Sequence, residues 1–283
     1  MKKFLVWILL ISMLALVACG GDDENSMPVV DPNARGDMFV HYIDVGQGDA
    51  IFIEFPNKAT MLIDAGDTAH ADKVTSYISN LGYDTLDYVV ATHPHAGHIG
   101  GLKAVFEKFT VKRIYMTNKS TEEQEYIDLL GAIENEGLKK LPAVAGNTIK
   151  DIADDVTGMF LAHRTLSADL HDSCAVFKLT YGNRTFLFMS DAGFKEEESI
   201  AWEYKCDVIK VAAHGAATAS GEEFLKNANA SIAVISCSKD NAPAKETLQN
   251  LDKAGIKQIL RTDEKGDITI KTNGDALEIT KGK

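Results

Sequence analysis

The chain has 283 residues, of which 45% are hydrophobic and 25% charged, a composition that excludes a disordered or fibrous protein and allows a full hydrophobic core. Its formal net charge is −12 at pH 7. Because an acidic surface repels polyanions, this charge argues against a nonspecific nucleic-acid-binding protein, although a small anionic substrate held by a metal ion is compatible with it.

The first residues predict a targeting segment. Lys2 and Lys3 precede an apolar run over residues 4–18, which is too short to span a bilayer but has the length of a signal-peptide core. The run ends in Leu16-Val-Ala-Cys-Gly20, which resembles the lipobox of bacterial lipoproteins, where the cysteine becomes the lipidated N-terminus after cleavage. We therefore expect a signal peptide over residues 1–18 and an extracytoplasmic bacterial lipoprotein, anchored in the membrane through lipid on Cys19. A plain signal peptide or a membrane anchor with an incidental cysteine is the alternative.

Residues 19–36 predict a flexible tether, because they lack apolar periodicity and are rich in Gly, Pro, Asp and Asn. The folded body is expected over residues 37–283. Its three cysteines each adjoin a β-type apolar run, so we expect buried free thiols at Cys174, Cys206 and Cys237.

The body begins with short strands and then alternates strands with helices. In its first part, strands are expected over 38–44, 50–55, 60–64, 87–92 and 111–116, and helices over 69–81, after Gly100, and over 121–136. In its second part, strands are expected near 156–161, 174–181, 184–189, 207–211, 232–236, 257–260, 267–271 and 276–280, and helices over 195–202, 221–227 and 244–254. Two runs of strands, each followed by helices, predict an α/β fold of two face-to-face sheets with helices outside.

The segment Ala91-Thr-His-Pro-His-Ala-Gly-His-Ile-Gly-Gly101 lies in a loop after a predicted strand, where α/β folds place their sites. His93 and His95 are two residues apart and project to the same side of an extended segment, so both imidazoles can face one ion. His98 lies at the entry to the next helix. Surface histidines without a partner are the alternative.

Seven motifs, in order over roughly 230 residues, resemble the metallo-β-lactamase superfamily, in particular the soluble hydrolase domain of the ComEC competence proteins. They are Tyr42-Ile-Asp-Val-Gly-Gln-Gly-Asp-Ala50, Leu62-Ile-Asp-Ala-Gly66, the histidine segment, His171-Asp-Ser-Cys-Ala-Val-Phe-Lys-Leu179, Leu187-Phe-Met-Ser-Asp-Ala192, Ile209-Lys-Val-Ala-Ala-His-Gly215, and Ile259-Leu-Arg-Thr-Asp-Glu-Lys-Gly-Asp-Ile268. The resemblance implies the αβ/βα four-layer sandwich and metal-dependent hydrolysis of a phosphodiester or related ester in the cleft between its halves.

Three motifs depart from the family pattern. Gly97 stands where the family has an aspartate that supplies a carboxylate to a second metal ion, and Ala213 stands where it has a histidine. A later Gly-His-Pro is absent, and the chain reads Asp240-Asn-Ala-Pro243 there. These losses put the second ion in doubt.

By this resemblance, His93, His95 and His171 would form a three-histidine site for one Zn²⁺ or Mn²⁺ ion. Asp191, His98 and His214 would form a second, weaker set, with Asp191 and His214 next to the reacting atoms. Asp64 is expected either to orient the histidine loop or to satisfy local backbone amides. The turn Gly46-Gln-Gly-Asp49 lacks the residues of a phosphate-binding loop and is expected to be only a tight turn.

Two hypotheses follow. The retained ligands favour a lipid-anchored metallo-hydrolase, whereas the three departures favour a catalytically inactive binding protein of the same fold at the cell envelope. A nuclease role is less favoured, because the chain is acidic and has no counterpart of the ComEC membrane channel.

Overall fold

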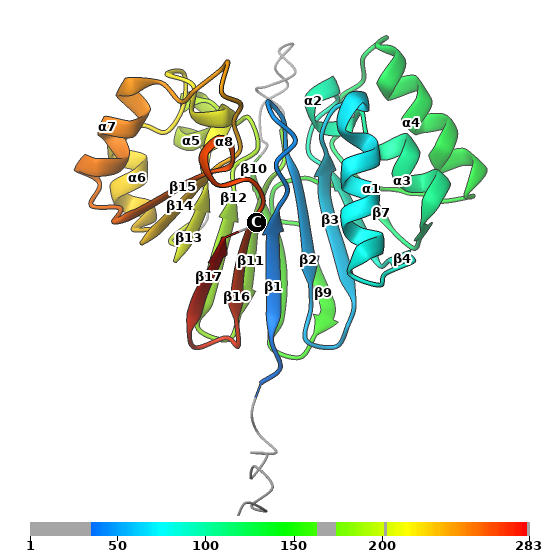
Figure 1. Cartoon of the computed structure of the whole chain (residues 1–283), viewed down its shortest axis with the longest axis horizontal. Coiled ribbons are helices and arrows are strands. Elements are labelled where there is room, and N and C mark those ends of the chain that lie inside the picture. The colour runs from blue at the N-terminus through cyan, green and yellow to red at the C-terminus, as the bar shows by residue number, and fades with distance from the viewer. Residues whose placement is uncertain (1–34, 163–173, 201–202, 282–283) are drawn as a thin grey trace, which may run out of the picture. The chain divides into compact units, whose positions relative to one another are not determined.

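Two large β-sheets form the centre of the chain in its computed structural model, which describes residues 35–162, 174–200 and 203–281 (Figure 1). The first sheet has the strand order β17-β16-β1-β2-β3-β5-β7-β8. In chain order its strands are β1 (Met38–Tyr42), β2 (Ala50–Glu54), β3 (Thr60–Ala65), β5 (Tyr88–Ala91), β7 (Ile114–Met116), β8 (Lys140–Pro142), β16 (Ile268–Thr272) and β17 (Leu277–Lys281).

The second sheet has the order β15-β14-β13-β12-β11-β10-β9. Its strands are β9 (Thr148–Ala153), β10 (Val156–Ala162), β11 (Val176–Tyr181), β12 (Arg184–Phe188), β13 (Val208–Lys210), β14 (Ile232–Ile235) and β15 (Gln258–Arg261). A two-stranded parallel pair, β4 (Thr85–Leu86) with β6 (Thr110–Val111), lies beside the first sheet.

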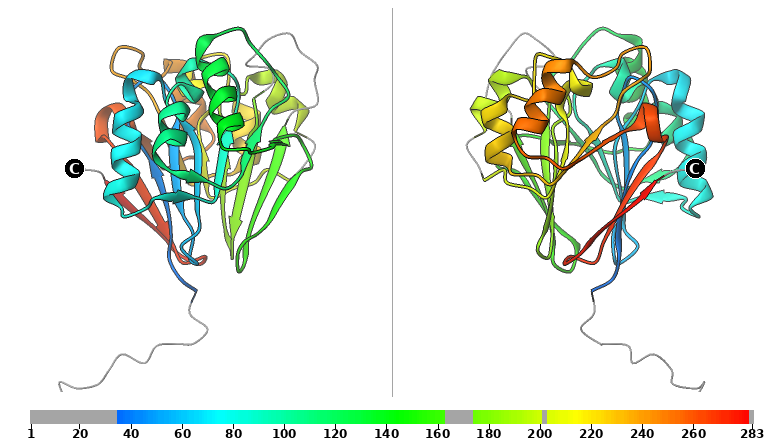
Figure 2. Two further views of the ribbon diagram at one scale, coloured as in Figure 1. Left: turned by 90° about the vertical axis from the view of Figure 1, so that its right-hand side faces the viewer. Right: turned by 60° about the vertical axis from the view of Figure 1, so that its left-hand side comes forward.

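Helices cover the outer face of each sheet, so the molecule has four layers (Figure 2). On the first sheet they are α1 (Ala71–Asn80), α2 (Ala96–Ile99), α3 (Leu102–Lys108) and α4 (Gln124–Asn135). On the second they are α5 (Phe194–Ser199), α6 (Glu222–Ala228) and α7 (Lys245–Lys253). Short helices η1 (Thr68–His70), η3 (Ala212–Gly215) and α8 (Thr262–Lys265) lie in connections.

Side-chain alternation along the strands builds three separate hydrophobic cores between these layers. In β12, Phe186 and Phe188 belong to the core between the sheets, whereas Leu187 belongs to the core under α6 and α7. In β2, Ile51 and Ile53 face the other sheet and Phe52 packs in the core under α1 and α3. Because successive strand residues point to opposite faces, each sheet can be apolar on both sides. The predicted αβ/βα four-layer sandwich is confirmed.

Several short elements lie outside the predicted ranges, among them β4, β8, β9, α2 and α8. Strand β9 is an edge strand that pairs antiparallel with β10, and three of its six residues are exposed, so its sequence carries little apolar signal. Helix α8 is only four residues long and joins two strands. Short elements at an edge or in a connection depend on their neighbours more than on their own residues.

The described part of the chain begins at Arg35, near the end of the predicted tether. The lipobox, Cys19 and most of the predicted tether lie outside the described residues. Arg35, within the predicted tether, already forms ion pairs with Asp155 and Asp275 at 3.0 and 3.1 Å. Across the described ranges, no helix combines the length and apolar character needed to cross a membrane. Cys174, Cys206 and Cys237 are buried free thiols, as predicted.

Candidate metal centre

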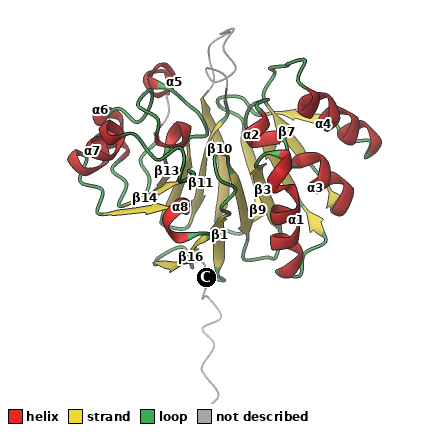
Figure 3. Cartoon of the chain, turned by 45° about the horizontal axis from the view of Figure 1, so that its top comes forward, coloured by secondary structure: helices red, strands yellow, loops and turns green. Residues whose placement is uncertain are grey.

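The candidate ligands lie at the carboxyl ends of parallel strands. Strand β3 runs parallel to β5, and β12 runs parallel to β13, so the loops that follow each pair leave the same edge of its sheet. His93 follows β5, Asp191 follows β12, and His214 lies in η3 after β13. Figure 3 shows these loops and short helices gathered on one side of the two sheets.

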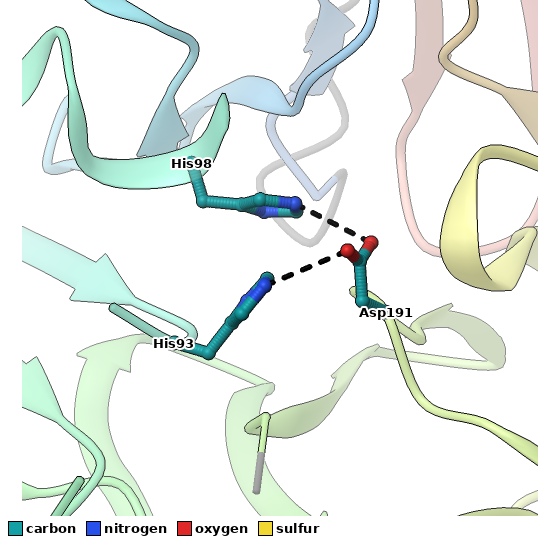
Figure 4. Close-up of side chains that lie close together, drawn as sticks. All are labelled: His93, His98 and Asp191. Carbon is teal, nitrogen blue, oxygen red and sulfur yellow. Dashed lines mark ion pairs between the residues drawn. The ribbon is translucent and has the colours of Figure 1, made fainter. Parts of the chain in front are cut away.

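The Asp191 carboxylate joins three buried histidines. Its Oδ2 lies 3.5 Å from His93 Nε2, and its Oδ1 lies 3.3 Å from His98 Nε2 and 3.3 Å from His214 Nε2. Figure 4 shows His93 and His98 pointing at the two oxygens of this carboxylate from one side. All four side chains are buried. The structure therefore brings residues from both halves of the sandwich to one carboxylate.

Asp64 fixes the orientation of His98. Its Oδ2 lies 2.7 Å from His98 Nδ1, and its two oxygens also accept hydrogen bonds from the Thr92 amide and hydroxyl at 2.8 and 2.6 Å. Because Nδ1 faces Asp64, Nε2 is the atom that faces Asp191. A carboxylate that accepts a hydrogen bond from one ring nitrogen of a histidine commonly orients the other nitrogen toward a metal ion, and Asp64 is placed to do this.

The other two histidines are also held through Nδ1. His93 Nδ1 lies 3.2 Å from the Thr92 hydroxyl and 3.3 Å from the Ser190 hydroxyl. His214 Nδ1 donates to the Ser236 carbonyl oxygen at 3.0 Å, since a carbonyl can only accept. In all three histidines, Nε2 is therefore the nitrogen directed at Asp191.

Burial and neighbouring charges shift the pKa values of the histidines in this cluster in different directions. Burial and the neighbouring His98 lower the pKa of His93 to about 4. Burial also acts against the charged form of His98, but the carboxylates of Asp191 and Asp64 outweigh it and raise the pKa of His98 to about 10. Burial lowers the pKa of His214. Without metal the cluster thus favours a neutral His93 and a charged His98.

The backbone around the cluster adopts conformations that L-residues rarely adopt. Positive φ angles occur at Asp64 (56°), Ser190 (50°), Ala213 (46°) and His214 (55°). For residues other than glycine, such conformations cost about 1–3 kcal/mol each and persist where the surrounding structure enforces them. Their concentration around Asp191 indicates that this fold is organised to hold the site.

Of the expected three-histidine set, the structure describes only His93 and His95. The His95 ring lies parallel to that of His93, at 3° with centroids 5.9 Å apart, but His95 is exposed. Among the described residues, the three-residue groups with ligand atoms within 4.8 Å of one another include His93, His98 and Asp191 but not His95. His171 lies outside the described residues. His95 lines a cavity of about 590 Å³ that also reaches Asp191 and His214.

Asp49 and Lys210 belong to this centre and were missed. Lys210 ends β13, is fully buried, and forms an ion pair with Asp49, which is 2% exposed. Burial would raise the pKa of Asp49, but the Lys210 ammonium and the nearby His214 and His98 hold it below the usual range. The sequence signal was a lysine inside the apolar run Val208-Ile-Lys-Val211, since a buried lysine needs an anionic partner.

The donor atoms fit a divalent metal ion. Two groups besides that of His93, His98 and Asp191 have ligand atoms within 4.8 Å of one another, namely Asp49 with Asp191 and His214, and Asp49 with Asp64 and His98. Imidazole nitrogens and carboxylate oxygens are ligands that Zn²⁺ accepts and that also suit Mn²⁺. Asp191 belongs both to the group with His93 and His98 and to the group with Asp49 and His214, so its carboxylate can bind a metal ion in either group.

The turn at Gly48 rests directly on the histidine loop, which leads to a stability prediction. A Cβ on Gly48 would lie 2.3 Å from the Gly97 carbonyl oxygen, so the two backbones would have to separate. We expect Gly48→Ala to destabilise the protein by about 1–3 kcal/mol, the usual cost of overpacking. As a control, Gly131→Ala is placed at an exposed position of helix α4, where a Cβ has nothing within 4 Å, and should stabilise by about 0.5–1 kcal/mol. Urea unfolding measures the free energy of unfolding of both variants. Equal changes in the two would contradict the close approach of Gly48 to the Gly97 carbonyl oxygen.

The comparisons with known proteins agree with this geometry. Residues 43–239 match the family model of the metallo-beta-lactamase superfamily. ComE operon protein 3 of Bacillus subtilis (strain 168) is 27% identical over 252 residues, an alignment that covers 81% of this chain and 32% of that protein. The chain thus spans about a third of this curated relative.

Two solved structures share the fold. The metallo-beta-lactamase fold protein YhfI from Bacillus subtilis has a TM-score of 0.55 and 16% identity, covering 83% of this chain and all of that one. Igni18, a metallo hydrolase from Ignicoccus hospitalis KIN4/I, has a TM-score of 0.53 and 18% identity, covering 82% of this chain and 98% of that one.

Proposed function

Because this chain belongs to the metallo-beta-lactamase superfamily, we propose that it is a metal-dependent hydrolase of a phosphodiester or related ester. The observation that carries the proposal is the Asp191 carboxylate, which three buried histidines approach within 3.5 Å and which lines a cavity together with His214. A purely structural network would not need to open onto a cavity of about 590 Å³.

The side chains of the site would have two roles, metal binding and contact with the reacting atoms. Asp191 would bind metal through both oxygens, and His93 and His98 would bind through the nitrogens that already face it. When bound, Zn²⁺ or Mn²⁺ supplies Lewis-acid activation of water and of the ester. His214 faces the cavity beside Asp191, which places it next to the reacting atoms.

The cavity wall suits an anionic substrate in spite of the acidic chain. Lys195 and Phe194 line it together with His95, and so offer an ammonium group and a partly exposed aromatic face. An ammonium attracts a phosphate or carboxylate group, and an aromatic ring packs against the apolar part of an ester. We therefore propose a small anionic ester as the substrate and consider nucleic acid a less favoured substrate.

Location at the membrane is part of the proposal. Cys19 would carry the lipid, and the tether would end at Arg35, where ion pairs to the folded body begin. The enzyme would then act outside the cytoplasm of a bacterium, close to the membrane but not within it. Mass spectrometry of the purified full chain would detect the loss of residues 1–18 and the added lipid mass on Cys19.

The experiment that tests the proposal combines metal analysis with an assay. Purified protein should contain Zn²⁺ or Mn²⁺ and should hydrolyse bis-p-nitrophenyl phosphate when that ion is added. His93→Ala removes one imidazole ligand and should lower the rate by about 10³-fold or more, since metal activation contributes several kcal/mol. The matched control is His70→Ala, because the His70 side chain is 38% exposed and its ring bonds to nearby Asp67 at 2.7 Å.

The competing hypothesis is an inactive binding protein, which the loss of ligands at Gly97 and Ala213 favours. It predicts no hydrolysis by wild type with either ion. Less than about a tenth of an equivalent of bound metal, together with equal rates for wild type and His93→Ala, would reject the hydrolase.

A further inference from the structure

We propose that Asp49 supplies the carboxylate of a second divalent-cation position, formed with Asp191 and His214. It would replace the side chain that Gly97 lacks. The inference rests on the metal centre of the proposed function, but it concerns a ligand outside the family's metal motifs and the number of ions bound.

The geometry places Asp49 at the right point. Its ligand atoms and those of Asp191 and His214 all lie within 4.8 Å of one another. Asp49 Oδ1 lies 3.8 Å from His214 Nδ1, and Asp49 Oδ2 lies 3.8 Å from His98 Nδ1. The carboxylate is thus beside both rings. Their Nδ1 atoms are held by Asp64 and by the Ser236 carbonyl, and the nitrogen that His214 offers to the cation is Nε2, which faces Asp191 Oδ1.

One oxygen of Asp49 is left for a cation. The Lys210 ammonium pairs with Oδ2. Oδ1 is buried and accepts no hydrogen bond from any residue that the structure describes. A buried carboxylate oxygen without a donor is costly, so its presence next to imidazoles and a second carboxylate indicates a position for a positive ligand.

The missing side chain at Gly97 explains why Asp49 is so close. The Asp49 amide donates to the Gly97 carbonyl oxygen at 3.2 Å, and Gly48 lies against the same oxygen. A Cβ on Gly97 would lie 3.2 Å from the Gln47 carbonyl oxygen, which is tight. The loop that carries Asp49 therefore packs on the face of residue 97 from which a carboxylate would otherwise extend.

Charge supports the same assignment. Asp49, Asp64 and Asp191 are three buried carboxylates, whereas Lys210 is one buried ammonium. A carboxylate at Asp49 lowers the electrostatic cost of placing a second divalent ion near the first. Lys210 is a positioning residue here, because it holds Oδ2 and directs Oδ1 at the site.

Metal counting tests the inference without any assay of activity. Metal-free full chain is dialysed to equilibrium against Mn²⁺ or Zn²⁺, and bound metal is counted by mass spectrometry. Wild type should hold two equivalents. Asp49→Asn should hold one, with the dissociation constant of the second ion raised at least about 10- to 100-fold, since even residues that only support metal ligands contribute this much. Asp49→Asn with Gly97→Asp, which returns a carboxylate from the other loop, should hold two again.

A further variant covers a folding failure. If Asp49→Asn alone unfolds, because it leaves Lys210 unpaired, Asp49→Asn with Lys210→Met removes both charges and should fold and hold one equivalent. One equivalent in saturated wild type, or two equivalents in folded Asp49→Asn or in folded Asp49→Asn with Lys210→Met, would overturn the inference. If wild type binds one ion and hydrolyses the ester, this inference is rejected and the proposed function is retained. If wild type binds two ions and shows no hydrolysis, the inference is retained and the proposed function is rejected.

Discussion

Asp191→Asn is expected to abolish metal binding and to lower metal-dependent hydrolysis by at least about 10³-fold. The amide keeps the shape of the side chain but loses its negative charge. In the wild type, Oδ2 lies beside His93, and Oδ1 lies beside His98 and His214. Because this one carboxylate belongs to two of the three ligand groups, its loss weakens both. Metal content and hydrolysis of bis-p-nitrophenyl phosphate measure the loss.

An independent readout separates this effect from unfolding. Asp191 contributes to the raised pKa of His98, so the pKa of His98 in metal-free Asp191→Asn should fall below its value of about 10 in wild type, which an NMR titration would follow. Asp128→Asn is the matched control, since Asp128 pairs with Lys103 on the surface. Wild-type metal content in a folded Asp191→Asn protein would contradict the central role of this carboxylate.

Lys210→Met is expected to cost about 3–5 kcal/mol of stability, the usual effect of removing one partner of a buried ion pair. Lys210 is fully buried at the end of β13 in the second sheet, and Asp49 precedes β2 in the first. The substitution leaves the Asp49 carboxylate buried without its ammonium. Urea unfolding of the metal-free protein would measure the change.

The double variant distinguishes a lost pair from lost packing. Lys210→Met with Asp49→Asn leaves no unpaired charge, so most of the stability should return. Lys103→Met breaks an exposed pair with Asp128 and should cost no more than about 1 kcal/mol. A loss below 1 kcal/mol for Lys210→Met would show that this buried pair does not tie the two sheets together.

The histidine segment shows how far sequence reasoning could reach. His93 and His98 were recognised as ligand candidates because three histidines in six residues follow a strand, and the structure places both at Asp191. The resemblance assigns His93 and His98 to two different ligand sets, and the structure adds that their rings lie 4.1 Å apart, centroid to centroid. Spacing along a strand gives the side on which a residue points, but the turn after Pro94 decides which imidazoles converge.

The sequence by itself determined the four-layer fold and the loops that carry the site, because alternation of apolar residues and the order of motifs are local properties of the chain. Only the tertiary structure decided that Asp49 and Lys210 meet inside the centre, since they are separated by 161 positions and come from different sheets. No pattern within either segment encodes that pairing. It arises because packing the two sheets face to face buries both charges, and a buried charge is stable only beside its opposite.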